Sequence, residues 1–186
     1  SYTIPTGDNF KKYSVVGTYT ENKFGTNDII QVSNKNGNER FYVMALSSII
    51  SGTHSTFYWY YNAYGNMNDY SRTTSTEFGT GKSNTEVMLT KWNGDTYGIQ
   101  DSNDIWEIIQ SQVENGWYIP SRDELVAFSS TFNITRDNYL NYNLPAFIWS
   151  SSQGSRSNVW SAHFNGGDIA LDSVRRSNYV RLGITF

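Results

Sequence analysis

The sequence predicts one α+β domain of antiparallel β-sheets with two or three helices, and three observations carry this prediction. Residues 1–75 and the segment after Pro145 are rich in β-forming residues and are punctuated by Gly, Asn and Thr. Helical spacing of apolar residues is confined to the middle of the chain. No linker or internal repeat divides the 186 residues, a length that suits a single domain. Separate β-rich and helical blocks are typical of an α+β architecture.

Two strands of the first block are expected to form a hairpin. Ile29–Val32 and Phe41–Leu46 flank residues 34–38, where the pair Asn36-Gly37 tolerates positive φ. The aromatic run over residues 57–70 follows, and we interpret it first as core packing. An exposed stacking platform for sugar rings or peptide is the alternative.

Three helix starts are predicted in the middle block. Asn84 is expected to cap the first helix and Asn103 the second, which ends at residues 115–116. The third start has the clearest signal. Ser121 and Glu124 have the S-x-x-E spacing of a capping box, in which each side chain binds the backbone of the other residue.

The last block predicts four short strands, with a turn at residues 165–167 between the second and the third: Ile148–Ser150, Val159–Phe164, Asp168–Val174 and Asn178–Phe186. The strand period of two divides the second of them into two faces. One face is expected to be scaffold, with Trp160, Ala162 and Phe164. The other is expected to be presented to a partner, with Ser161, His163 and Asn165.

Composition excludes several kinds of chemistry. The chain has no cysteine, and therefore no disulfide, thiolate metal site or cysteine nucleophile, and its two histidines cannot form a three-histidine metal face. A net charge of −3 gives no basic field for nucleic acid. No apolar run approaches the roughly 18 residues that span a bilayer. We therefore expect no metal, no cofactor, no nucleic-acid partner and no membrane insertion.

No catalytic motif is complete. Residues 79–83 (GTGKS) end like a phosphate-binding loop, but Thr76 stands where that loop requires glycine, so a turn before a helix is expected. There is no G-x-S-x-G elbow, and neither His54 nor His163 has a recognisable activating context. We therefore expect no enzyme.

The C-terminal 75 residues resemble a known family. Residues 116–125 (GWYIPSRDEL) have the G-W-x-[LIV]-P-[ST]-x-x-E-[LW] pattern of C-type-lectin-like domains of the formylglycine-generating-enzyme type. Residues 149–152, 159–167 and 178–182 resemble the closing block of the same domains. The resemblance implies a C-type lectin-like fold with a buried frame of Trp117, Trp149, Trp160, Phe164 and Val180.

Within that group, residues 150–186 resemble the variable region of the target proteins of diversity-generating retroelements. The resemblance implies a diversifiable surface that binds a protein or glycan receptor, on a phage virion or at a bacterial cell surface or in a secreted protein. It implies these ligand-binding positions: Arg156, Ser161, His163, Asn165, Asp168, Ala170, Asp172, Ser173, Arg175, Arg176 and Tyr179.

The resemblance also limits function. The catalytic relatives hold copper with a cysteine pair, or iron with a histidine set, and this chain can supply neither. The proline motifs of Ca²⁺-dependent sugar-binding lectins are missing too. Two alternatives stay open: an enzyme or cofactor-binding domain with an unrecognised site, and a structural adhesin or tail module.

Overall fold

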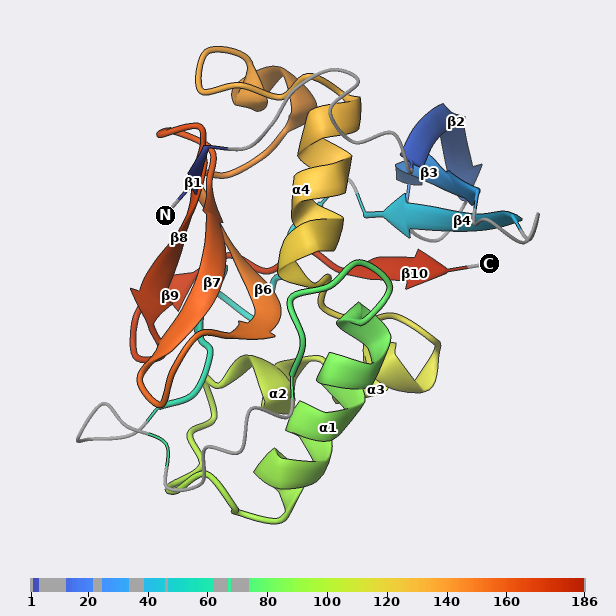
Figure 1. Cartoon of the computed structure of the whole chain (residues 1–186). Coiled ribbons are helices and arrows are strands. Elements are labelled where there is room, and N and C mark those ends of the chain that lie inside the picture. The colour runs from blue at the N-terminus through green and yellow to red at the C-terminus, as the bar shows by residue number, and fades with distance from the viewer. Residues whose placement is uncertain are drawn as a thin grey trace.

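Two four-stranded antiparallel sheets lie on either side of one helix, α4 (Arg122–Thr131), as Figure 1 shows. The computed structural model describes residues 2–3, 13–21, 25–33, 39–45, 47–61, 67 and 74–185, and all structural statements concern these residues. Within them, helices and antiparallel sheets occur together, so the predicted α+β class is confirmed.

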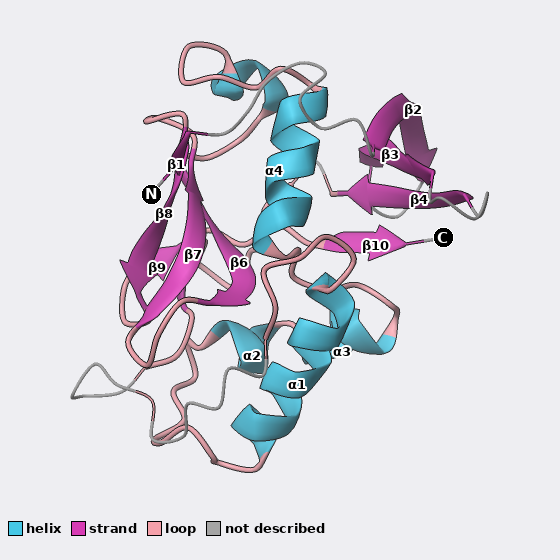
Figure 2. Cartoon of the chain, viewed as in Figure 1, coloured by secondary structure: helices cyan, strands magenta, loops and turns pink. Residues whose placement is uncertain are grey.

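The first sheet has the strand order β1-β8-β7-β6, the second has the order β10-β4-β3-β2, and β5 pairs with β9 separately. The strands are β1 (Tyr2–Thr3), β2 (Tyr13–Glu21), β3 (Gly25–Ser33), β4 (Glu39–Met44), β5 (Phe57–Tyr58), β6 (Phe147–Gln153), β7 (Asn158–His163), β8 (Asp168–Ser173), β9 (Ser177–Asn178) and β10 (Gly183–Thr185). The other helical elements are α1 (Gly81–Asn93), α2 (Ile105–Ile108), α3 (Gln110–Glu114) and a 3₁₀ turn (Tyr139–Tyr142), shown in Figure 2.

The β-hairpin expected in the first block is confirmed. β3 and β4 pair from Ser33 and Glu39 onward, although residues 34–38 lie outside the described part. The turn predicted between the second and third strands of the last block is also confirmed, because β7 and β8 pair as a hairpin. In addition, β6 pairs with β7. The last predicted strand is divided, because β9 pairs with β5 whereas β10 pairs with β4 of the second sheet.

The predicted capping box begins α4. The Ser121 side chain accepts from the backbone N–H of Glu124 at 3.3 Å, and the Glu124 carboxylate accepts from the N–H of Ser121 at 2.6 Å. The same carboxylate accepts from Gly81 N at 3.1 Å, so the first turn of α1 is bound to the first turn of α4. Burial raises the pKa of Glu124 to about 7, against hydrogen bonds that lower it.

The predicted start of the first helix was wrong, because α1 begins at Gly81 and Asn84 lies inside it. The buried Asn84 amide binds the backbone N–H and carbonyl of Ser75, each at 2.8 Å, and therefore ties a loop to the helix instead of capping it. The residues that resembled a phosphate-binding loop form the turn and the helix start, as expected.

The second predicted helix is divided at Ile109 into α2 and α3, so the described residues form one α-helix more than the largest number expected. Its N-cap position is held by Asp104 instead of Asn103. The fully buried Asp104 carboxylate accepts from Tyr61 N, Trp92 Nε1 and Asp101 N. Burial raises the pKa of Asp104 to about 6.

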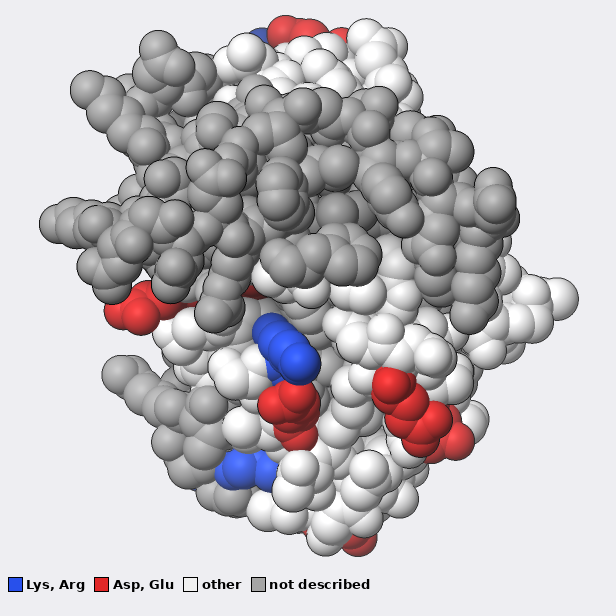
Figure 3. All heavy atoms as spheres, turned by 90° about the vertical axis from the view of Figure 1, so that its right-hand side faces the viewer, with Lys and Arg blue, Asp and Glu red and all other residues white. Residues whose placement is uncertain are grey.

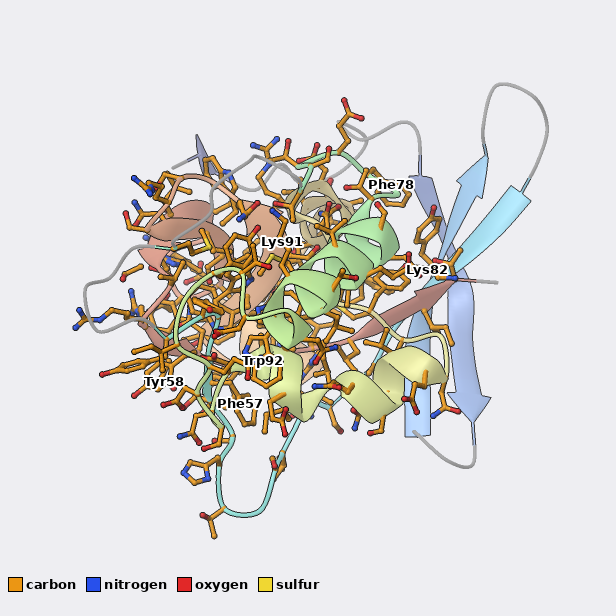
Figure 4. The ribbon with its side chains drawn as sticks, turned by 90° about the horizontal axis from the view of Figure 1, so that it is seen from below. Phe57, Tyr58, Phe78, Lys82, Lys91 and Trp92 are labelled. Atoms are coloured by element: carbon orange, nitrogen blue, oxygen red, sulfur yellow. The ribbon has the colours of Figure 1, made fainter. Side chains whose placement is uncertain are left out.

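Two apolar clusters flank the first sheet. One joins Trp149 and Val159 to the helical half and includes the aromatic residues Phe57, Trp59 and Tyr60. Figure 4 shows Phe57 of β5 and Trp92 of α1 in this half. The core interpretation of the aromatic run is thus confirmed for these three residues, while residues 62–66 and 68–70 lie outside the described part. The other cluster lies between α4 and the sheet, and contains Ala162, Phe164 and Ile169.

No helix in the described part is long and apolar enough to cross a bilayer. On the face seen in Figure 3, the described residues carry charges of both signs in small groups. This face therefore gives no strong field of one sign within the part that the structure describes.

Candidate functional site

The candidate site is the β7–β8 hairpin with the loops at its two ends, at the left of Figure 1. Nine of the eleven predicted ligand-binding residues reach the surface. Five are exposed: Arg156, Asn165, Ser173, Arg175 and Arg176. Four are half-buried: His163, Asp168, Ala170 and Tyr179. The two others, Ser161 and Asp172, are buried.

Ser161 was expected on the presented face, and this expectation was wrong. Its side chain is fully buried, and the Asn178 side chain from β9 lies against it on this face of the sheet. Ser161 Oγ donates to the Ile148 carbonyl at 2.8 Å and accepts from Asn178 Nδ2 at 3.1 Å. Ser161 therefore belongs to the scaffold of the hairpin and not to its surface.

Asp172 was also expected to be presented, and it is only 4% exposed. Its Oδ2 accepts from Asn178 Nδ2 and interacts with His163 Nε2, both at 2.9 Å, and its Oδ1 accepts from Arg176 Nη1 at 2.9 Å. Burial opposes the ionised form of Asp172, but these hydrogen bonds and the nearby charges outweigh it and hold the pKa of Asp172 below its ordinary value. We call Asp172, His163, Arg176, Asn178 and Ser161 the Asp172 network.

The strand register explains how His163 reaches Asp172. His163 lies beside Phe147 of β6 and Asp168 of β8, whereas Asp172 lies beside Val159 at the other end of the hairpin. Between these two rows stand only the small side chains of Ser161 and Ala170, which face each other. The His163 ring can therefore extend over these small side chains to reach Asp172.

Arg176 covers the network from outside. Its guanidinium lies 4.4 Å from the centre of the Phe147 ring, which in turn meets the His163 ring edge-on at 4.9 Å. The Arg176 side chain is 44% exposed, and its guanidinium makes no hydrogen bond besides that to Asp172 among the described residues. One buried carboxylate and one aromatic face thus hold an exposed arginine in a fixed orientation.

Arg156 and Arg175 lie at the opposite end of the hairpin from residues 165–167. Their loops are neighbours, because Val174 N donates to the Ser157 carbonyl at 2.9 Å. Asn165 lies in the β7–β8 turn, and Tyr179 lies beside β6, where its carbonyl accepts from Trp149 N. The structure therefore spreads the exposed positions over both ends of the hairpin and one flank.

Four residues of the expected frame are buried: Trp117, Trp149, Phe164 and Val180. Trp160 was expected among them but is only half-buried. Its cross-strand partner Leu171 is 44% exposed, and the Arg122 guanidinium lies 5.0 Å from the centre of the Trp160 ring. The face of the hairpin that carries Trp160 and Leu171 thus lies at the edge of the core and not in its interior.

Sequence reasoning missed two residues of this site, Phe147 and Asn178. The contact of Phe147 with His163 depends on the β6–β7 register, which shifts between Trp149 and Gln153. Asn178 enters the site because β9 pairs with β5, a strand about 120 residues earlier in the chain. Neither relationship has a local signal in the sequence.

The two carboxyl groups with raised pKa values, Asp104 and Glu124, are bound to backbone and indole N–H groups in the helical half and at the start of α4. The described residues contain no group of three or more His, Asp or Glu side chains that could hold a metal ion. His163 is paired with Asp172 at the surface of the hairpin. Within the described part, the geometry at the hairpin is that of a contact surface with a fixed arginine.

Comparison with models of known protein families gave no match, and comparison with curated protein sequences gave no significant similarity.

Proposed function

We propose that this chain is a non-enzymatic recognition domain that binds a receptor through the exposed residues of the β7–β8 hairpin. One observation carries the proposal. The hairpin contains a buried frame and a set of nine surface-reaching polar, small or aromatic residues, and the two are distinct in position. Apart from His163 and Arg176, which bind the buried Asp172, substitutions within the surface set leave core packing intact, so affinity and stability are separable there.

The buried members of the hairpin support the same function. Ser161 and Asp172 bind neighbouring strands and side chains, and so hold the hairpin rigid beneath its surface. A rigid surface loses little conformational entropy on binding. The proposed site therefore combines a fixed backbone with exchangeable contacts.

The scaffold in this proposal is a C-type lectin-like fold of the formylglycine-generating-enzyme type. The residues that carry the resemblance occupy structural positions: Trp117 is buried, Gly116 has φ of +92°, and Ser121 with Glu124 caps α4. A glycine is favoured where φ is positive, and a capping box specifies a helix start. The motif is therefore accounted for by architecture and needs no catalytic role.

The proposal extends to the class of protein. We infer a variable protein of a diversity-generating retroelement, displayed on a phage virion or at a bacterial surface or secreted, whose partner is a protein or glycan receptor. In this interpretation the codons that vary are those of the residues in 150–181 whose side chains reach the surface. The codons of the buried Ser161 and Asp172 stay constant.

Sequencing of the DNA beside the gene tests this proposal. We expect a reverse-transcriptase gene and a near-copy of the codons for residues 150–181 that differs mainly at adenines. Differences should fall on the exposed positions, such as Arg156, Asn165 and Arg175, and spare Ala162 and Ile169 of the core. A locus with neither gene nor near-copy would contradict the retroelement assignment.

A further inference from the structure

We propose that Arg176 forms a preorganised binding point for a carboxylate, presented by an acidic side chain on the surface of a partner protein. The inference rests on the proposed function, because it names the chemistry of the partner at the same surface. Its evidence is independent of any family resemblance. It depends on the geometry around the buried Asp172 carboxylate.

Arg176 is oriented before any ligand arrives. Its Nη1 is 2.9 Å from Asp172 Oδ1, and its guanidinium lies over the Phe147 ring. The remaining guanidinium N–H groups have no hydrogen-bond partner among the described residues, and the side chain is 44% exposed. A guanidinium presents its donors as a planar fork that matches the two oxygens of a carboxylate. Such a fork, held on one edge, leaves its other edge for a ligand.

His163 supports the aromatic ring and the carboxylate that hold this fork. Its Nε2 is bound to Asp172 Oδ2, its ring contacts the same Phe147 that lies beneath Arg176, and its side chain is 16% exposed. Asp172 therefore acts as a positioning residue: it binds Arg176 directly and holds His163 against the ring beneath the guanidinium, without touching a ligand there.

The charge of the hairpin region favours an anion. Residues 153–181 contain four arginines and two aspartates, a formal charge of +2 in a chain whose net charge is −3. Three of these arginines are exposed, whereas Asp172 is buried and Asp168 is half-buried. The fourth arginine, Arg181, is buried like Asp172, so the surface of the hairpin keeps the net positive charge that its composition indicates. Complementary charge favours an acidic partner and speeds its association.

The side chains around the fork favour a protein over a sugar acid. Phe147 is half-buried and its ring centre lies 4.4 Å from the Arg176 guanidinium, so it presents flat apolar area beside the arginine. Arginine is among the residues enriched where the affinity of protein interfaces is concentrated. A partner with an acidic side chain next to an apolar one would satisfy both features.

Nuclear magnetic resonance of the arginine Nε–H groups tests the proposal at the level of single residues. The probes are two capped pentapeptides with a central glutamate or glutamine flanked by leucines, together with 3′-sialyllactose and lactose. We expect the glutamate peptide to shift the Arg176 signal saturably, with affinity about tenfold above that of the glutamine peptide, the effect of one charge-assisted hydrogen bond. Arg136, which is 70% exposed and whose Nε is 3.7 Å from the exposed Asp137 carboxylate, serves as the comparison arginine in the same spectrum.

Two substitutions separate orientation from charge. Arg176→Lys keeps the charge but removes the fork, and we expect it to abolish the difference between the two peptides. Asp172→Asn keeps Arg176 but removes the group that orients it, and we expect a loss of about tenfold in affinity for the glutamate peptide. Arg136→Lys is the matched control and should change neither value. Thermal unfolding of each variant checks that it is folded. If Asp172→Asn does not fold, the result for Arg176→Lys decides the test.

Three results would overturn the inference. They are equal shifts by the glutamate and glutamine peptides, shifts of Arg136 as large as those of Arg176, and tighter binding of sialyllactose than of the glutamate peptide. If the glutamate peptide gives no saturable shift of the Arg176 signal at millimolar concentration, this result would also overturn the inference. None of these results affects the DNA test above, so failure of the carboxylate site is distinguishable from failure of the proposed function.

Discussion

The Glu124 carboxylate and the backbone N–H of Gly81 are 3.1 Å apart, and this contact joins the N-termini of two helices that are 43 residues apart in the chain. Each helix start has N–H groups that have no partner within the helix. Here one carboxylate binds N–H groups at both starts, which fixes the helical half against α4.

Gly81→Ala is expected to destabilise the protein by about 1–3 kcal/mol, since overpacking of a filled site forces its neighbours apart. A Cβ at this position would lie 2.3 Å from Glu124 Oε2 and 2.9 Å from the backbone oxygen of Ile119. Urea unfolding measures the change. Lys82→Ala, on the exposed next residue of the same turn, is the control and should stay within about 0.5 kcal/mol. Equal effects of the two substitutions would contradict the contact.

Stability is expected to fall as pH rises through the range in which Glu124 and Asp104 ionise. The pKa of Glu124 is raised from 4.5 to about 7, and that of Asp104 from 3.8 to about 6. The folded state therefore holds these protons at pH values where the unfolded state has lost them. Their contribution is fully present below the unfolded values and is lost by about pH 7, at roughly 1.4 kcal/mol for each unit of raised pKa.

Glu124→Gln isolates one of these two contributions. Urea unfolding at several pH values between 4 and 8 should show a smaller decline of stability with pH in the variant than in the natural chain. The remaining decline should level off above pH 6, as Asp104 completes the loss of its proton. Identical pH profiles for the two proteins would show that Glu124 does not titrate in this range.

Ser161→Ala is expected to destabilise by about 1–3 kcal/mol, because it leaves the buried Ile148 carbonyl and one Asn178 N–H without this partner. Ser173→Ala removes the same hydroxyl from an exposed position of the adjacent strand and should cost no more than about 0.5 kcal/mol. Thermal unfolding of the two variants compares them directly. The opposite order would restore Ser161 to the surface set.

Phe164→Ala is expected to cost about 3–5 kcal/mol, the range for a buried aromatic residue. Trp160→Ala should cost less although tryptophan is larger, because Trp160 is only half-buried and lies beside the exposed Leu171. Denaturant titration of both variants gives the order. A larger loss for Trp160 would place it in the core.

Elements with local signals could be predicted from the sequence. The Ser121–Glu124 spacing located the start of α4, and alternation with turn residues located β7 and β8. Asn84 misled because its amide binds Ser75 and Ser151, which come from a loop and a distant strand. An asparagine that caps a helix and an asparagine that binds a loop from inside the helix cannot be distinguished by residue type in the sequence.

The candidate site was predictable in its location and not in its depth. Alternation along β7 assigned Ser161 and His163 to one face correctly, since both lie opposite the α4 side. Whether such a face is open depends on which side chains cover it, and here Asn178 of β9 contacts both Ser161 and Asp172. The β9 strand is itself paired with the distant β5. Burial of Ser161 and Asp172 is therefore a tertiary property that no period within the strand encodes.

The sharing of Asp172 among three partners has a consequence for how the surface can evolve. Substitutions at His163, Arg176 and Asn178 will be epistatic, because each changes the number of donors that compete for the same two oxygens. A change at Asp172 would alter all three at once. The sequences accessible at these positions are then the combinations that keep the number of hydrogen-bond donors to Asp172. Such combinations are far fewer than those that independent positions would allow.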